Sequence, residues 1–447
     1  MLKAGAAQVE ITPDPGVWLT GYASRTQPAT GTHDPLFARA LYLESGATRT
    51  ALAVADIIGF DDHLVERIRQ GAAAADLHPS HVMLAATHTH SAPSIRCLHR
   101  MAPVDPQAME RAAQGMIQAI VTAAKAAENA AIGAGFTTGS IGVNRRQRAS
   151  DGRILLEPNP GGPVDRQVGV LRVEGEVARS RATATAAAGL AAGPICVMLN
   201  HACHGVVLDA DNLLYSADWP GAAARTVRDA VGAGVAMVTN GACGDINPAE
   251  RGSFEAMERQ GAAIARSGLD ILNRIQLSSQ VRLDAAARRV ELPTRALTPQ
   301  EAAQTLERTR GDLERARESG NPAAIRACEV VLPWAQEMVD LAAGGAPPQP
   351  VIAEIQAIAI DDIALVGLPG EVFVEIGMNI RAASPFRDTF IIGYANRSVG
   401  YLPTRAAFDE GGYEVEFAHR YYGFPPFTPE VQGIVEGTAR ELLKSLR

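Results

Sequence analysis

Four of the ten histidines fall in two pairs, and each pair follows a short apolar segment. His88 and His90 are two residues apart, so their side chains share one face of an extended backbone. His201 and His204 follow the second apolar segment in the same way. Neutral imidazole is a common zinc ligand, and a catalytic zinc site typically has three protein ligands and one position for water. The two pairs therefore indicate a metal site, and the alternative is that all four are ordinary core or surface histidines.

Three further residues near these pairs have side chains that could take part in chemistry. Glu371 follows a Leu-Pro-Gly turn at the start of a predicted helix and could supply an oxygen ligand. Cys203 lies between two of the histidines, where it could bind a metal or pack as a small buried residue. Cys243 lies in a glycine-rich turn and could be a nucleophile, but the sequence assigns no base to it.

These side chains need a rigid frame, and the sequence predicts strands that alternate with helices. Apolar strands are expected at 81–86 and 195–199, directly before the two histidine pairs. A strand hairpin is expected at 351–360 and 363–366, and a long amphipathic helix at 106–129. Polar residues at strand ends of such sheets commonly line a ligand crevice. The pattern predicts an α/β (α+β) fold, with a large mixed β-sheet domain flanked by helices.

Residues 296–349 differ in character from the strands on either side. Thr298-Pro299-Gln300-Glu301 combines an N-cap, a proline at the first helical position and a capping-box glutamate. The helix that begins there is charged and extends to about residue 318, and Gly320-Asn321-Pro322 separates it from a second helix that ends near residue 343. We interpret 296–349 as a helical hairpin inserted within a single domain of residues 1–447.

Composition excludes several classes of protein. The chain has 447 residues, of which 47% are hydrophobic and 20% charged, so a disordered or fibrous protein is excluded. A net charge of -8 without a long basic run gives no reason to expect nucleic acid as a partner. The longest apolar run, 363–368, is too short for a membrane span, and the N-terminus lacks an apolar signal segment. We therefore expect a cytoplasmic protein, and the sequence leaves its oligomeric state open.

Motifs spread along the chain resemble the neutral/alkaline non-lysosomal ceramidases, in particular their N-terminal catalytic domain. The segment Ala86-Thr87-His88-Thr89-His90-Ser91-Ala92-Pro93 is similar to the THTHSGP motif of that family. Further matches are 4–13, Asn144-Arg145, His201, 244–248, Pro369-Gly370-Glu371, Ala395-Asn396 and Gly400-Tyr401. The matches occur in the family's order and cover most of 4–295 and 350–425. The hairpin at 296–349 has no obvious equivalent in the family.

The resemblance implies one zinc ion per chain. In the family the metal is held by two histidines, a glutamate and a tyrosine, which correspond here to His88, His201, Glu371 and Tyr401. On this basis His204 is expected in the surroundings of the ligands. We expect the zinc ion to generate hydroxide at neutral pH from a bound water molecule.

The same resemblance implies roles for residues around the metal. His90 corresponds to a residue that contacts substrate or relays protons, and Arg145 to an arginine beside the scissile group. Tyr413 corresponds to a tyrosine that donates a hydrogen bond to the developing oxyanion. Asn247 stands where the family has a serine proposed as nucleophile or proton donor. An amide cannot act as a nucleophile, so Asn247 is expected to orient water or donate to the oxyanion.

These observations lead to a functional hypothesis with two alternatives. We expect a zinc-dependent amidohydrolase that cleaves a linear carboxamide (N-acyl) bond of a small molecule. Ceramide is not the expected substrate, because the family's secretion signal and C-terminal immunoglobulin-like domain have no counterpart in this sequence. The alternatives are a zinc esterase, lactonase or phosphoesterase at the same site, and a catalytically silent protein that retains zinc and binds a ligand.

Overall fold

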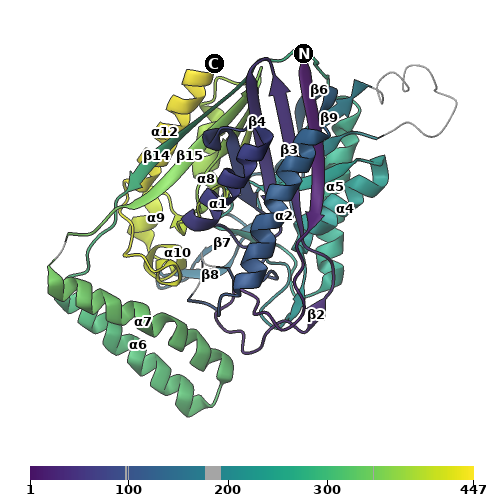
Figure 1. Cartoon of the computed structure of the whole chain (residues 1–447). Helices are drawn as coiled ribbons and strands as arrows, with labels where there is room; N and C mark the ends of the chain where they lie inside the picture. The colour runs from purple at the N-terminus through teal and green to yellow at the C-terminus, as the bar shows by residue number, and fades with distance from the viewer. Residues whose placement is uncertain (96–97, 99, 177–192, 346) are drawn as a thin grey trace.

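A large mixed β-sheet forms the centre of the molecule, which a computed structural model describes at residues 1–95, 98, 100–176, 193–345 and 347–447 (Figure 1). Within these residues its eight strands are, in spatial order, β12 (Val235–Asn240), β10 (Cys196–His201), β9 (Gln167–Gly175), β6 (Glu128–Thr138), β1 (Leu2–Glu10), β3 (Phe37–Ser45), β4 (Thr48–Ala55) and β5 (Val82–Ala86). The pairs β10–β12 and β4–β5 are parallel, and the other pairs are antiparallel.

A second sheet packs against one face of the first. Its four strands in the described part of the chain are β14 (Leu283–Leu292), β15 (Val351–Ile360), β16 (Ile363–Gly367) and β18 (Asp388–Ile392). Side chains alternate across each strand, so in β4 Leu52 and Val54 face the second sheet, whereas Ala51 and Ala53 face the covering helices. Both faces of β4 are therefore buried, which explains its nearly continuous apolar sequence.

Helices cover the outer faces of both sheets (Figure 1). The first sheet is covered by α1 (Asp62–Ala72), α2 (Pro106–Lys125), α4 (Asp218–Val231) and α5 (Phe254–Leu272). The second sheet is covered by α8 (Val374–Ala382) and α12 (Val431–Leu446). The predicted fold class, a large mixed sheet flanked by helices, is confirmed. None of the helices that the structure describes has a stretch long and apolar enough to cross a membrane.

The long helix expected at 106–129 ends earlier than predicted. Helix α2 stops at Lys125, and β6 begins at Glu128, where its first two residues pair with β1 and residues 130–138 pair with β9. Alanine-rich sequence continues across this boundary, so local helix propensity does not mark it. Pairing with a distant strand decides where the helix ends.

Short elements complete the frame and connect it to the functional residues. The short strands are β2 (Gly31–Thr32), β7 (Gly142–Arg148), β8 (Ile154–Asn159), β11 (Leu214–Tyr215), β13 (Ile246–Pro248), β17 (Glu371–Val372) and β19 (Tyr401–Leu402). The short helices are the 3₁₀ turns η1 (Ala73–Ala75) and η2 (Pro79–His81) together with α9 (Arg405–Glu410), α10 (Tyr413–Glu416) and α11 (His419–Tyr422). Strands β17 and β19 pair in parallel, which places Tyr401 opposite Glu371.

Two helices project from the body between β14 and β15, which pair with each other as antiparallel neighbours (Figure 1). They are α6 (Pro299–Ser319) and α7 (Pro322–Gly344), and the capping box of Thr298 and Glu301 forms at the start of α6. Trp334 of α7 is buried and donates its indole N–H to the carbonyl of Phe424 at 3.0 Å. This contact helps to dock the two helices, called the hairpin below, on the body.

His419 lies buried where the hairpin meets the body. Its ring packs edge-on against Trp334 with 5.1 Å between ring centroids. Among the described residues, neither of its ring nitrogens has a hydrogen-bond partner within 3.5 Å. Burial, together with the charge of Arg420, lowers the pKa of His419 to about 3, although the carbonyl of Val415 opposes the shift.

We expect His419→Gln to weaken the pH dependence of stability. The unfolded chain binds a proton on this residue near pH 6.5, whereas the folded chain does so only near the lowered pKa. The contribution of neutral His419 is therefore complete above about pH 6.5 and is lost as the pH falls toward 3. Between about pH 7 and pH 5, the drop in the free energy of unfolding should be smaller by about 2 kcal/mol in the variant. Urea titrations at both pH values measure this, and parallel pH profiles would contradict it.

Candidate active site

His88 occupies a strained position just beyond the end of β5. Its backbone φ is 56°, in the left-handed region that residues other than glycine rarely adopt. Its Nδ1 atom donates to the carbonyl of Ile58 at 2.5 Å, and its ring stacks on Tyr394 with 3.9 Å between centroids. Because Nδ1 carries the proton, Nε2 keeps a free lone pair, the form in which imidazole binds a metal.

His204 is held in the same tautomer from the other side of the site. It lies in the turn after β10, and its Nδ1 atom contacts the carbonyls of Cys243 at 2.7 Å and Ile246 at 3.1 Å. Burial, and then the positive charge of Arg145, lower the pKa of His204 to about 4, against the opposing effect of Glu371. The imidazole is therefore neutral at pH 7.

Glu371 brings a carboxylate to both imidazoles. Its Oε2 atom lies 2.9 Å from Nε2 of His204 and 3.4 Å from Nε2 of His88. Its Oε1 atom accepts a hydrogen bond from the hydroxyl of Tyr422 at 2.5 Å. Burial alone would raise the pKa of Glu371, but the nearby His88 and the close contact with His204 outweigh it and hold the pKa well below its ordinary value. The group is an ionised carboxylate in a buried position.

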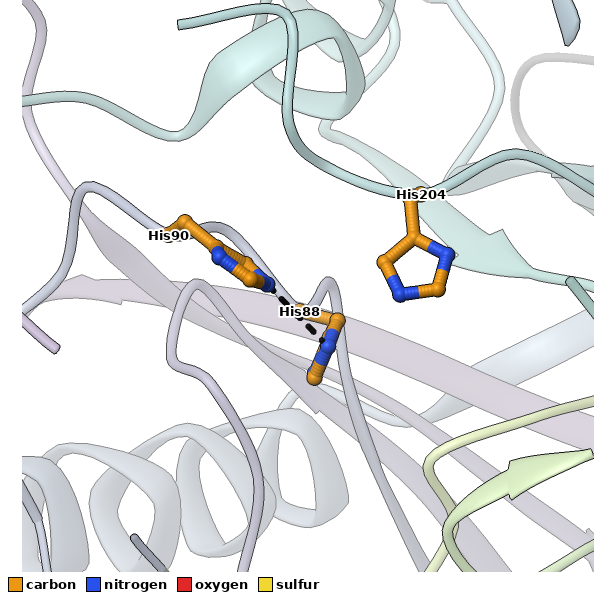
Figure 2. Close-up of side chains that lie close together, drawn as sticks. All are labelled: His88, His90 and His204. Carbon is orange, nitrogen blue, oxygen red and sulfur yellow. Dashed lines mark hydrogen bonds between the residues drawn. The ribbon is translucent and has the colours of Figure 1, made fainter. Parts of the chain in front are cut away.

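His90 completes a group of three imidazoles (Figure 2). Its Nε2 atom lies 3.3 Å from Nε2 of His88, and one ring nitrogen from each of His88, His90 and His204 falls within 4.8 Å of the others. Burial keeps the pKa of His90 well below its ordinary value, so its ring is neutral.

The donors at this site could hold a metal ion. Two imidazoles offer unprotonated Nε2 atoms, because carbonyls fix the proton on the opposite nitrogen, and an ionised carboxylate lies between them. Two histidines and one glutamate form a ligand set typical of catalytic zinc sites, and carbonyls behind the imidazoles are typical outer partners.

Arg145 lies beside Tyr401 and donates hydrogen bonds to three side chains. From β7 it donates to the hydroxyl of Tyr401 at 2.9 Å, to Oδ1 of Asn247 at 3.0 Å and to a carboxylate oxygen of Glu414 at 2.9 Å. The ring of Tyr413 stands edge-on to that of Tyr401 at 5.8 Å, and the Arg145 guanidinium lies 5.9 Å from its centroid. Burial raises the pKa values of Tyr401 and Tyr413 well above 10, so both phenols keep their protons in the free protein.

Comparison with known proteins identifies the family. The family model described as neutral/alkaline non-lysosomal ceramidase, N-terminal, matches residues 2–268, which is more than half of the chain. The chain belongs to the neutral/alkaline non-lysosomal ceramidase family. The resemblance noted in the sequence is confirmed, and the chain is a ceramidase-like hydrolase.

Solved structures of ceramidases share its fold. The crystal structure of the neutral ceramidase from Pseudomonas aeruginosa has a TM-score of 0.73 and 21% identity, and the match covers 100% of this chain and 74% of that one. A ceramidase complexed with C2 has a TM-score of 0.73 and 20% identity, with coverage of 100% and 75%. No curated protein matches the chain.

In this ceramidase-family chain His201 does not join the other candidate ligands. It is the last residue of β10, its Nδ1 atom contacts the carbonyl of Gln167 at 3.0 Å, and its ring lies edge-on to Trp219. The backbone turns after β10, so the side chain three residues later, that of His204, reaches Glu371 instead. The geometry therefore favours His204 over His201 as a candidate ligand.

Several residues that support the site had no assigned role in the sequence. Tyr422 donates to Glu371, and Tyr394 stacks on His88 while its hydroxyl contacts the thiol of Cys243 at 3.2 Å. No spacing in the sequence relates these tyrosines to the histidines, so only the fold could place them. Cys243 itself is buried, and burial raises the pKa of its thiol well above the ordinary value, which argues against a nucleophile.

Asp245 connects the strands behind the site. Its carboxylate accepts hydrogen bonds from the backbone N–H of Val374 at 2.8 Å and from the side chain of Asn144 at 2.9 Å. Burial raises the pKa of Asp245 to about 7. Because Asn144 precedes Arg145 and Val374 begins α8 shortly after Glu371, this carboxylate ties two functional segments together.

Proposed function

We propose that this protein is a zinc-dependent amidohydrolase that cleaves the N-acyl bond of a small carboxamide and that ceramide is not its preferred substrate. The observation that supports this most strongly is the meeting of Nε2 of His88, Nε2 of His204 and Oε2 of Glu371. The solved structures of similar fold carry the name ceramidase, which suggests the chemical class of the bond.

The candidate ligands are His88, His204 and Glu371, and Tyr401 is the fourth candidate because β19 places it opposite Glu371. We expect one zinc ion per chain. Bound there, zinc would acidify a water molecule and polarise the scissile carbonyl.

His90 is the candidate proton carrier. Its imidazole is neutral, so it can accept a proton from water and later return it to the leaving amine. Its position is fixed by tight packing, because a Cβ atom on Gly21 would lie 2.4 Å from the ring. Any side chain at residue 21 would therefore displace this imidazole.

Arg145, Tyr413 and Asn247 are the candidates for stabilising the oxyanion. Arg145 brings a buried positive charge, and Tyr413 retains a phenolic proton that it can donate. The side-chain oxygen of Asn247 faces Arg145, which leaves its amide N–H₂ as a donor. No nucleophilic hydroxyl is needed at this position when water is the nucleophile.

Metal analysis combined with a substrate panel tests the proposal. Purified protein should contain about one zinc per chain, and a chelator should remove zinc and activity together, with recovery on adding zinc back. Short or polar N-acyl amines should be hydrolysed faster than ceramide, and matched esters separate an amidase from an esterase or lactonase. Full activity without metal would contradict the mechanism. Stable zinc without turnover on any amide or ester would favour the silent binding protein.

A further inference from the structure

A cavity of about 370 Å³ lies between the hairpin and the short helices α10 and α11. Trp334, Phe408 and Phe427 contribute apolar surface to it. Its charged lining residues are three arginines and two glutamates, Arg295, Arg308, Arg420, Glu301 and Glu416. The cavity therefore combines an apolar wall with an excess of positive charge.

Both glutamates of this cavity already have partners. Glu301 forms the capping box of α6, in which it accepts a hydrogen bond from the backbone of Thr298 at 2.7 Å. It also accepts one from Arg295 at 2.9 Å. Glu416 turns back to accept the backbone N–H of Gly412 at 3.3 Å. Neither glutamate forms an ion pair with Arg308 or Arg420.

Arg308 and Arg420 form the positive centre of the cavity. No carboxylate of the described residues lies within 4 Å of either guanidinium. Arg420 is held in place by aromatic rings, with its Cζ atom 4.4 Å from the centroid of Phe417 and 5.1 Å from that of Trp334. Its buried Nε atom has no acceptor among the described residues. Burial and the neighbouring charge of Arg308 lower the pKa of Arg420 and outweigh the opposing effects of Tyr421, Asp312 and Glu416.

His419 adds an unused polar group to the same cavity. Only 6% of the residue is exposed, and within the described chain neither ring nitrogen has a hydrogen-bond partner within 3.5 Å. A buried polar group without a partner costs free energy unless a ligand or water satisfies it. A neutral imidazole beside the Arg420 guanidinium can donate its N–H to an anion.

We propose that this cavity binds a small organic anion whose carboxylate or phosphate contacts Arg308 and Arg420 while its apolar part packs on Phe408 and Phe427. A planar guanidinium pairs with two oxygens of such an anion, and the aromatic wall favours an apolar body. The ring of Phe417 lies between the cavity and the candidate active site, because it packs on Arg420 and stacks on Tyr413. The anionic group therefore belongs either to the far end of the amide substrate or to a separate ligand.

Calorimetric binding of three matched probes tests the site directly. Phenyl phosphate and benzoate carry an anionic group on an apolar ring, and benzamide is the neutral match of benzoate. We expect both anions to bind at least about tenfold more tightly than benzamide, and their binding to weaken as salt is added. Equal binding of benzoate and benzamide, or no binding of any probe, would overturn the proposal.

Variants within one helix locate the binding. Arg308→Gln should weaken phenyl phosphate binding about tenfold or more, because it removes a charged hydrogen-bond donor. Arg308 is exposed, so its replacement leaves the fold intact. Arg310→Gln is the control, since Arg310 is also exposed on α6 but contacts Gln336 instead of the cavity. An Arg308 variant that binds as well as the Arg310 variant would refute the assignment.

Inhibition kinetics with an amide substrate identify the source of the anion. This measurement rests on the proposed function. If phenyl phosphate competes with an amide substrate and raises KM, the site takes the substrate's own anionic end. If it changes kcat without competition, the site takes a separate ligand. The calorimetric arm needs neither metal nor turnover, so failure of the amidohydrolase proposal would leave it interpretable.

Discussion

Replacing His204 by asparagine should abolish zinc binding and turnover, whereas the same replacement of His201 should preserve both. Asparagine keeps a side-chain N–H near the position of imidazole Nδ1, so it can still donate to the carbonyls behind each ring. It removes the Nε2 atom that in His204 lies 2.9 Å from Glu371. We expect His204→Asn to lower kcat/KM by roughly a thousandfold or more, because the acidified water is lost with the metal.

The two variants control for each other. Both residues are buried at the end of the same strand, His201 as its last residue and His204 in the turn after it, so a general effect of disturbing this region should appear in both melting curves. Metal content by mass spectrometry and hydrolysis of the best amide substrate are the readouts. If His201→Asn lost zinc and His204→Asn retained it, the ligand would be His201, as the family resemblance implies.

Much of the frame could be predicted from the sequence because its strands are buried on both faces. Strands β5 and β16 have continuous apolar or small residues, and β15 is apolar except at Glu354 and Gln356. All three form within one or two residues of the expected positions. The pairing of strands across the chain was not predictable. Register between segments such as β6 and β9 depends on packing, and the same alanine-rich sequence also suits a helix.

The part of the candidate site that lies in one short motif was predictable from the sequence. The part that depends on how the backbone turns after a strand was not. His88 and His90 lie in one short motif, and the structure places their Nε2 atoms 3.3 Å apart. The choice between His201 and His204 depends on how the chain leaves β10, which neither residue type nor spacing fixes. Tyr422 reaches Glu371 from a separate helix, so its contact depends on tertiary structure alone.

Arg145→Gln should lower kcat by about a hundredfold to a thousandfold while zinc content stays unchanged. Arg145 donates to Tyr401 and to Asn247 and brings the buried positive charge nearest to both. A neutral amide at this position cannot balance an oxyanion, and it leaves the phenol of Tyr401 without its donor. The measurement is steady-state kinetics on an amide substrate alongside metal analysis of the same preparation, with KM expected to change much less than kcat.

The neighbouring arginine supplies the control that separates catalysis from folding. Arg146 binds the other carboxylate oxygen of Glu414 at 2.8 Å and also pairs with Glu410, but it has no contact with Tyr401 or Asn247 among the described residues. Each substitution leaves Glu414 with one arginine, so both should cost similar stability. Arg146→Gln should therefore lower the melting temperature about as much as Arg145→Gln but leave kcat nearly unchanged. An equal loss of kcat in both variants would mean that Arg145 acts through Glu414 and the position of α10, and that its charge has no direct part in the reaction.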